Sequence, residues 1–284
     1  MYPMISIVMP IYNSSFYLHE SIMSILNQTF EDFEFIIIDD GSTDNSIDII
    51  KRYQDKRINL QTLEHDYIVS LNYGMRLAKG KYIVRMDSDD KMLPGRLQKQ
   101  FDFMETNPDI AVSGCWFQTF GTESKIYQLD TTHDAIVCNL LSGNPMCHPS
   151  VIMRKEVLSS LFYEKGKDIY DKSFIYAEDY KLWYDIIKEG YRFANIPEVL
   201  LLYRCSDKQA SRKECDLSLK SALKVRMAYL KEVCKWILLK DPSYLSQLKD
   251  LFDLQENNDI NFFELCDRVK VIYQAVLRIY NPLK

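Results

Sequence analysis

The chain has 284 residues, of which 47% are hydrophobic and 26% are charged, and its formal net charge is -5 at pH 7. That length can bury the core of one large domain with an appendage, or of two small domains. The acidic balance argues against a generally nucleic-acid-binding surface. No apolar run approaches the roughly 18 residues that a membrane span needs.

The cysteines and the first residues bear on the cellular compartment. Seven cysteines are scattered along the chain without a C-x-x-C pair, so we expect reduced, mostly buried thiols rather than disulfides or a zinc site. Strand-like sequence begins by Ile5, and the residues before it lack the pattern of a signal peptide. Both features predict a cytoplasmic protein.

The first half of the chain is predicted to alternate strands and helices. Runs rich in β-branched residues indicate strands at residues 5–12, 33–39, 58–63 and from 81 onward. Turn signals and the spacing of apolar residues indicate helices at residues 18–26, from the 41–44 turn to 53, and at 68–78. Because strands and helices alternate with short loops, we predict an α/β fold with a parallel, doubly wound sheet.

Polar residues follow three of these strands. Tyr12 follows the first, Asp39-Asp40 end the second, and the fourth ends in the sequence DSDD at 87–90. The carboxyl ends of such strands meet where ligands bind, so we expect these residues to converge. Three carboxylates this close repel one another, which suggests a divalent cation or a cationic partner. The alternative is that Asp89 or Asp90 caps a helix that begins near residue 93.

These residue types suit a nucleotide diphosphate. An aromatic ring can stack on a base, and a carboxylate can accept a hydrogen bond from a base or a ribose. Mn²⁺ and Mg²⁺ prefer oxygen ligands and bind through one or two carboxylates together with substrate phosphates. No predicted strand is followed by G-x-G-x-x-G or by a Walker P-loop. We therefore expect a metal and side chains, rather than a glycine-rich loop, to hold the nucleotide.

Four segments in this order resemble the family 2 glycosyltransferases. They are MPIYN at 9–13, SILNQT at 24–29, IDDGSTD at 38–44 and MDSDD at 86–90. The resemblance covers residues 3–212 and implies the GT-A fold, a Rossmann-like and mainly parallel sheet, in an enzyme of the bacterial surface-glycan type. It implies an inverting hexosyl- or N-acetylhexosaminyl-transferase that uses a nucleotide sugar, commonly UDP-linked, with Mn²⁺ or Mg²⁺. The acceptor would be a hydroxyl of a glycan or a lipid-linked oligosaccharide.

The resemblance assigns donor-site roles to residues of these segments. Pro10 and Tyr12 would line the base, and Asp40, together with Asp39, would contact the uracil. In the DSDD sequence, Asp87 would lie near the ribose and the metal, Asp89 would bind the metal, and Ser88 would belong to the same donor site.

Two further polar residues match family positions near the donor. They are Asn72 in the sequence LNYG and His148 in the sequence CHPSV. The alternatives are that Asn72 is a surface polar residue on a helix and that His148 is a structural histidine.

A second acidic pair, Glu178-Asp179, stands where a helix is predicted to begin, and Gly190 closes that helix. From the residues alone, the pair is explained as part of a capped amphipathic helix. The resemblance makes Asp179 the candidate general base, which would remove the acceptor proton as the hydroxyl oxygen attacks the anomeric carbon. Glu178 would orient Asp179 or bind the acceptor.

One departure from the family pattern affects the metal. Where relatives often carry a metal-binding histidine, this chain has Ser206. Either Asp207 takes over that role, or the metal relies on Asp89, phosphates and water. Gln209 and Arg212 could close over the diphosphate, and a polar loop is the alternative.

We predict a transferase domain at residues 1–212 and an all-helical extension at 213–284. The extension begins with a helix that carries Lys220, Lys224, Lys231 and Lys235, and it ends with a helix at 262–280. A basic amphipathic helix can lie on an anionic membrane surface, which would give peripheral contact with the inner face of the membrane. The alternative is that this helix packs on its own domain. Residues 121–147 are expected to include a loop over the acceptor side.

Two other functions fit part of this pattern. A sugar-1-phosphate nucleotidyltransferase also places an acidic metal site on a similar sheet, but its glycine-rich, arginine-bearing loop is replaced here by PIYN at 10–13. A catalytically degenerate module that only binds a sugar nucleotide is the non-enzymatic alternative. The retained acidic residues Asp87, Asp89 and Asp179 argue against it, and Ser206 argues for it.

Overall fold

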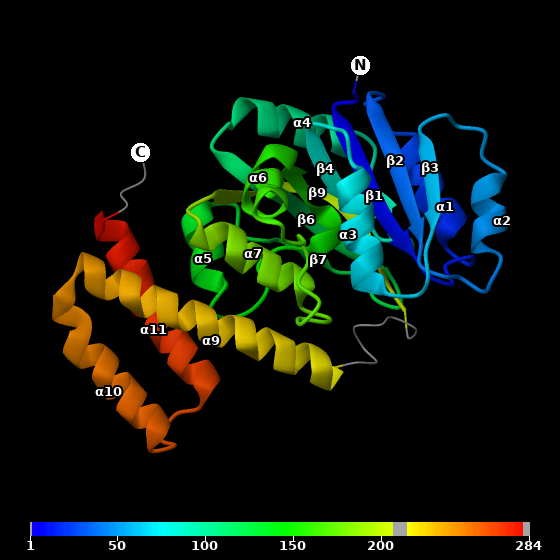
Figure 1. Ribbon diagram of the computed structural model, residues 1–284. Coiled ribbons are helices and arrows are strands. Elements are labelled where there is room, and N and C mark those ends of the chain that lie inside the picture. Colours follow the sequence, from blue (N-terminus) through cyan, green and yellow to red (C-terminus); the bar gives the residue numbers. More distant parts are fainter. Residues whose placement is uncertain (1, 207–214, 281–284) are drawn as a thin grey trace.

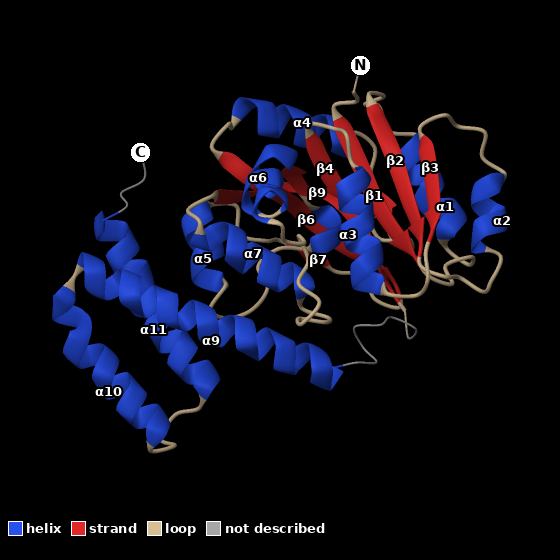
Figure 2. Ribbon diagram, viewed as in Figure 1, coloured by secondary structure: helices blue, strands red, loops and turns tan. Residues whose placement is uncertain are grey.

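A computed structural model describes residues 2–206 and 215–280 of the chain. A twisted sheet with helices on both faces forms the body of the molecule, and the C-terminal helices pack against one side of it (Figures 1 and 2).

The N-terminal half forms the predicted parallel layer. Four strands lie in the order β3-β2-β1-β4 and pair in parallel. The elements are β1 (Ile5–Ile11), α1 (Leu18–Leu26), β2 (Phe33–Asp39), α2 (Ser46–Lys51), β3 (Ile58–Thr62), α3 (Tyr67–Leu77) and β4 (Tyr82–Arg85). The first strand is buried along its whole length, because helices cover both faces of the sheet.

Beyond β4 the sheet becomes mixed, in the order β8-β6-β9-β5. Strand β8 runs antiparallel to both β4 and β6, whereas β6 and β9 are parallel. The elements are β5 (Lys91–Met92), α4 (Arg96–Thr106), β6 (Ile110–Gly121), β7 (Ile126–Tyr127), α5 (His133–Asn139), β8 (Ile152–Arg154), α6 (Lys155–Leu161), α7 (Glu178–Lys188) and β9 (Arg192–Cys205). The stretch at 121–147 therefore contains β7 and α5 in addition to loop.

The described part of the C-terminal region is helical, as predicted. It consists of α9 (Cys215–Lys240), a 3₁₀ turn at Pro242–Tyr244, α10 (Leu245–Glu256) and α11 (Phe262–Tyr280). The buried face of α9 joins the same apolar core as α5 and α7, and the phenol of Tyr229 donates to the Val137 carbonyl at 2.9 Å. The predicted boundary at 212/213 lies outside the described residues.

Two further sequence expectations can be compared with the described residues. In 2–206 and 215–280, no helix is long and apolar enough to cross a membrane. Each of the six cysteines whose side chain is described is a free thiol.

Candidate active site

The loops that follow β1 and β2 are joined by hydrogen bonds. The side-chain oxygen of Asn13 accepts from the backbone N–H of Thr43 at 2.8 Å, and the backbone N–H of Ser15 donates to Asp44 at 2.9 Å. Asn13 has a positive φ of 47°, a conformation that asparagine tolerates better than most residues. The carboxyl ends of the first two strands therefore form one connected surface.

Tyr12 lies on this surface and stacks on His65. The ring centroids are 4.0 Å apart at an interplanar angle of 20°, and 46% of Tyr12 is exposed. The Nδ1 atom of His65 lies 2.8 Å from the carboxylate of Asp40. The other carboxylate oxygen of Asp40 accepts from the hydroxyl of Ser70 at 2.7 Å and from the backbone N–H of Asp66 at 2.8 Å.

Three predicted base-site residues are buried. Asp40 is buried, and the carboxylate oxygen that lies beside His65 accepts no hydrogen bond from the described residues. Pro10 lies inside β1 opposite Ile38 of β2. Asp39 is also buried, and its Oδ2 has no hydrogen-bond partner among the described residues.

The four residues of the DSDD sequence have separate environments. The hydroxyl of Ser88 lies 2.7 Å from that of Ser14 in the loop after β1. Asp90 is buried and accepts from the backbone N–H of Arg204 at 2.7 Å. The helix that follows starts at Arg96 after Gly95, so neither Asp89 nor Asp90 caps it, and that alternative is wrong.

Asp89 is half-buried, and no other described side chain donates a hydrogen bond to it. Burial and the nearby charge of Asp87 raise the pKa of Asp89 to about 6. A cation beside this carboxylate would offset both effects, because it favours the ionised form.

The last residue of β4, Arg85, is a buried cation at the centre of the site. Its guanidinium forms an ion pair with Asp87 and donates to the phenol of Tyr67 at 2.7 Å. The Nε of Arg85 has no hydrogen-bond partner among the described residues. Asp87, which the sequence predicted for the ribose and the metal, is therefore already paired with a guanidinium.

The acidic pair Glu178-Asp179 begins α7, where the helix dipole favours negative charge. One carboxylate oxygen of Asp179 accepts from the side-chain amide of Asn144 and the other from the backbone N–H of Tyr180, both at 2.7 Å. Asp179 is half-buried, whereas Glu178 is buried and its Oε2 has no partner among the described residues.

The two carboxyls differ in the contacts that favour their charged forms. Burial, followed by the charge of Asp179, raises the pKa of Glu178 to about 8. Burial also raises the pKa of Asp179, and its hydrogen bonds and the charge of Arg85 oppose this. Burial therefore favours the protonated form of Glu178, whereas the hydrogen bonds from Asn144 and Tyr180 favour the ionised form of Asp179.

The acidic ends of β4 and α7 share one electrostatic environment. Arg85 lowers the pKa of both Glu178 and Asp179, and the charge of Asp87 raises the pKa of Glu178. Arg85 and Asp87 therefore lie within electrostatic range of the acidic pair at the start of α7.

Asn72 and His148 are both buried and both contact Tyr170. The amide of Asn72 donates to the backbone carbonyl of Tyr170 and accepts from its N–H, each at 2.9 Å. The Nε2 of His148 lies 2.8 Å from the phenol oxygen of Tyr170. Burial and the charge of Arg85 hold the pKa of His148 well below its usual range, so the ring is neutral. The side chain of Asn72 is not at the surface, and His148 has the contacts of a structural histidine.

The described acidic residues are compatible with a metal ion whose ligands come mainly from the phosphates of a substrate. No group of three or more His, Cys, Asp or Glu side chains within residues 2–206 and 215–280 could enclose a metal ion. One or two carboxylates suffice when phosphates supply the other ligands, and the half-buried Asp89 receives no side-chain hydrogen bond from the described part of the chain. Ser206 follows directly after β9, and Asp207, Gln209 and Arg212 lie outside the described residues.

Sequence reasoning missed three residues that build this site: His65, Arg85 and Asn144. Arg85 carried a readable signal, because a single charged residue ends the otherwise apolar strand Tyr82–Arg85. His65 and Asn144 lie in loops, and only the folded chain shows what they contact.

Comparisons with known proteins bear on the family and the fold of this chain. The sequence profile of Glycosyl transferase family 2 matches residues 6–162. An uncharacterized glycosyltransferase of Haemophilus influenzae is 35% identical over 74% of this chain and 68% of its own length. The O-antigen biosynthesis glycosyltransferase WbnJ of Escherichia coli is 35% identical over 78% of this chain and 90% of its own length. The structure of S. aureus TarS 1-349 in complex with UDP-GlcNAc matches with a TM-score of 0.67 at 17% identity, over 97% of this chain and 73% of that one.

Proposed function

This chain belongs to glycosyl transferase family 2 and has the GT-A fold, and from that premise we propose that it transfers a hexosyl or N-acetylhexosaminyl residue from a UDP-sugar with inversion. The acceptor is a hydroxyl of a glycan or a lipid-linked oligosaccharide. The printed roles of two similar proteins support this choice, because WbnJ acts in O-antigen biosynthesis and TarS is described with UDP-GlcNAc. The free thiols support a cytoplasmic location for the reaction.

The donor nucleotide would lie over the joined loops after β1 and β2. Tyr12 is the exposed aromatic ring on this surface, with His65 stacked behind it. A uracil ring stacked on Tyr12 would lie on a two-ring platform, because His65 stacks on Tyr12 and lies beside the carboxylate of Asp40. The buried Asp39 and Pro10 would support this platform from within the strand ends.

The diphosphate would lie beside the DSDD sequence. Asp89 would hold Mn²⁺ or Mg²⁺ together with the phosphate oxygens, and the metal would neutralise charge on the departing diphosphate. Asp87, held by Arg85, and Ser88, held by Ser14, would border the ribose and phosphates.

The transfer itself needs one base. The acceptor oxygen forms a bond to the anomeric carbon while the bond from that carbon to the diphosphate oxygen breaks, and Asp179 takes the hydroxyl proton. UDP leaves with the electron pair of the broken bond, so the sugar inverts in a single displacement. Glu178, protonated, would donate a hydrogen bond to the acceptor or keep Asp179 in position.

The observation that carries this proposal is the geometry of Asp179. It is a half-buried carboxylate fixed by Asn144 and the Tyr180 amide, within electrostatic range of the Arg85 guanidinium that pairs with Asp87. A panel of UDP-sugars assayed for UDP release with Mn²⁺, Mg²⁺ or a chelator tests it. We expect metal-dependent UDP release with one sugar preferred. Release of pyrophosphate from UTP and a sugar 1-phosphate would identify a nucleotidyltransferase, and tight UDP binding without turnover would identify a binding module.

A further inference from the structure

A stripe of lysines runs along the exposed side of α9. Its members are Lys220, Lys224, Lys231 and Lys235, with the half-exposed Met227 between them. At 100° per residue these five side chains fall within an arc of about 80°. The stripe is about 22 Å long, and its neighbours toward the two helix ends, Leu217 and Leu239, are 42% and 79% exposed.

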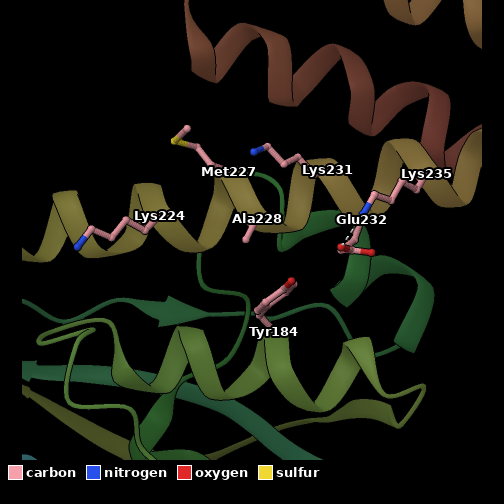
Figure 3. Close-up of a pocket in the computed structure, with 7 residues that line it drawn as sticks. All are labelled: Tyr184, Lys224, Met227, Ala228, Lys231, Glu232 and Lys235. Carbon is pink, nitrogen blue, oxygen red and sulfur yellow. Dashed lines mark hydrogen bonds and ion pairs between the residues drawn. The ribbon is translucent and has the colours of Figure 1, made fainter.

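A groove of about 370 Å³ lies beside this lysine stripe, between α7 and α9. Its lining includes Lys224, Lys231, Lys235, Met227 and Ala228 of α9, and Tyr184 of α7. Figure 3 shows the three lysines spread along α9, with Tyr184 rising from α7 toward that helix. Two more lysines of α7 flank the same ring, because the Nζ atoms of Lys181 and Lys188 lie 5.6 and 5.9 Å from the Tyr184 ring centroid.

Most of this positive charge is not neutralised locally. Glu232 pairs with Lys235 at 3.2 Å, and Asp185 pairs with Lys181 at 2.5 Å. Lys188, Lys224 and Lys231 have no acidic partner within ion-pair distance among the described residues. The groove therefore has an excess of positive charge on a chain whose formal net charge is -5.

We propose that the lysine stripe and the groove form a face that binds the phosphate headgroups of an anionic lipid bilayer. The exposed Met227, Leu217 and Leu239 favour a bilayer over a soluble anion, because apolar side chains gain nothing from a ligand that stays in water. A narrow, straight stripe also matches a flat surface better than a compact ligand. The N-terminal end of α9 contacts the active-site side of the molecule, since the Ser218 hydroxyl donates to the carbonyl of Tyr176, two residues before α7.

Vesicle co-sedimentation of the full chain tests this face without any measurement of activity. The wild type is mixed with vesicles of about 30% phosphatidylglycerol in phosphatidylcholine, and with pure phosphatidylcholine. The test variant K224E/K231E reverses two unpaired lysines of the stripe. The matched control K79E/K155E makes the same change in net charge at a second lysine-containing cavity, beside the starts of β1 and β4, which is lined by Lys79, Lys81 and Lys155.

The proposal predicts binding to the anionic vesicles only, and loss of that binding in about 0.5 M NaCl. Each lysine near an anionic surface contributes about fivefold in affinity, so K224E/K231E should bind at least about 25-fold more weakly, while K79E/K155E stays within about twofold of the wild type. A third variant, M227E, should weaken binding without reversing a lysine. Equal loss in the two lysine variants, equal binding to neutral vesicles, or no binding to the anionic vesicles would overturn the proposal.

Discussion

The buried guanidinium of Arg85 forms an ion pair with Asp87, the first carboxylate of the DSDD sequence. The same guanidinium opposes the rise that burial causes in the pKa of Glu178 and Asp179 at the start of α7. One cation thus faces the acidic residues of the proposed donor side and of the proposed base. It limits the repulsion that would otherwise accompany so many carboxyl groups in one place.

Replacing Arg85 by methionine should destabilise the fold. The change leaves Asp87 without its counter-ion, and we expect a loss of about 2 kcal/mol, less than for a fully buried pair because Asp87 is partly exposed. Urea unfolding measures this. The double variant R85M/D87N removes both charges and should recover at least half of the loss, and a double variant that is as unstable as R85M or more so would contradict the pairing.

The protonation of Glu178 should appear in the pH dependence of stability. Its pKa in the folded state, about 8, lies above the value of 4.5 in the unfolded chain. Between these values the folded protein holds a proton that the unfolded chain has released, so stability falls as the pH rises. The E178Q variant has no carboxyl that titrates at this position. We expect the difference in free energy of unfolding between E178Q and the wild type to shift by roughly 2–4 kcal/mol in favour of E178Q between about pH 5 and pH 8.5. If the free energies of unfolding of E178Q and the wild type changed with pH in parallel, Glu178 would be ionised in the folded protein, which would contradict this prediction.

Tyr12 should contribute to nucleotide affinity through its ring. Stacking of a base on an aromatic side chain is worth about 1–3 kcal/mol, so Y12A should weaken UDP binding by that amount in calorimetry. The Y12F variant keeps the ring and should bind within about threefold of the wild type. If Y12A binds UDP normally, the base lies elsewhere.

Asn72 should affect stability and leave the donor site intact. Its two buried hydrogen bonds to the backbone of Tyr170 predict that N72A loses about 1–3 kcal/mol of unfolding free energy. Because the amide is used by the protein itself, the dissociation constant for UDP should change by less than about threefold. A large loss of UDP affinity in a folded N72A protein would instead indicate that Asn72 contacts the donor directly.

The sequence predicts the regular elements of this fold better than the mixed part of the sheet. Strand β2 and helix α11 have the predicted bounds, because apolar periodicity and turn residues mark their ends. Strand β8 has three residues and β9 contains Pro197, so neither shows a strand pattern of its own, and both are stabilised by pairing with distant strands. Helix α10 lies in the extension that was predicted to be helical, but its own bounds were not predicted.

For the candidate site as well, the sequence predicts some features and not others. Spacing predicts which edge of the sheet a residue reaches, and the DSDD sequence and Glu178-Asp179 do lie near each other. Spacing does not predict which residues a side chain contacts in the folded protein. Asp40, Asn72 and His148 are taken up by contacts with His65 and Tyr170, residues brought close only by folding.

The most direct test of the account is the rate of UDP release by D179N, measured beside its affinity for UDP. Asp185 lies on the same helix and pairs with Lys181, so D185N is a matched control for an acid-to-amide change on α7. We predict that D179N binds UDP within about threefold of the wild type and releases UDP from the donor sugar at least about 100-fold more slowly, while D185N keeps its rate within about twofold. Normal turnover by D179N would contradict the assignment of Asp179 as the base.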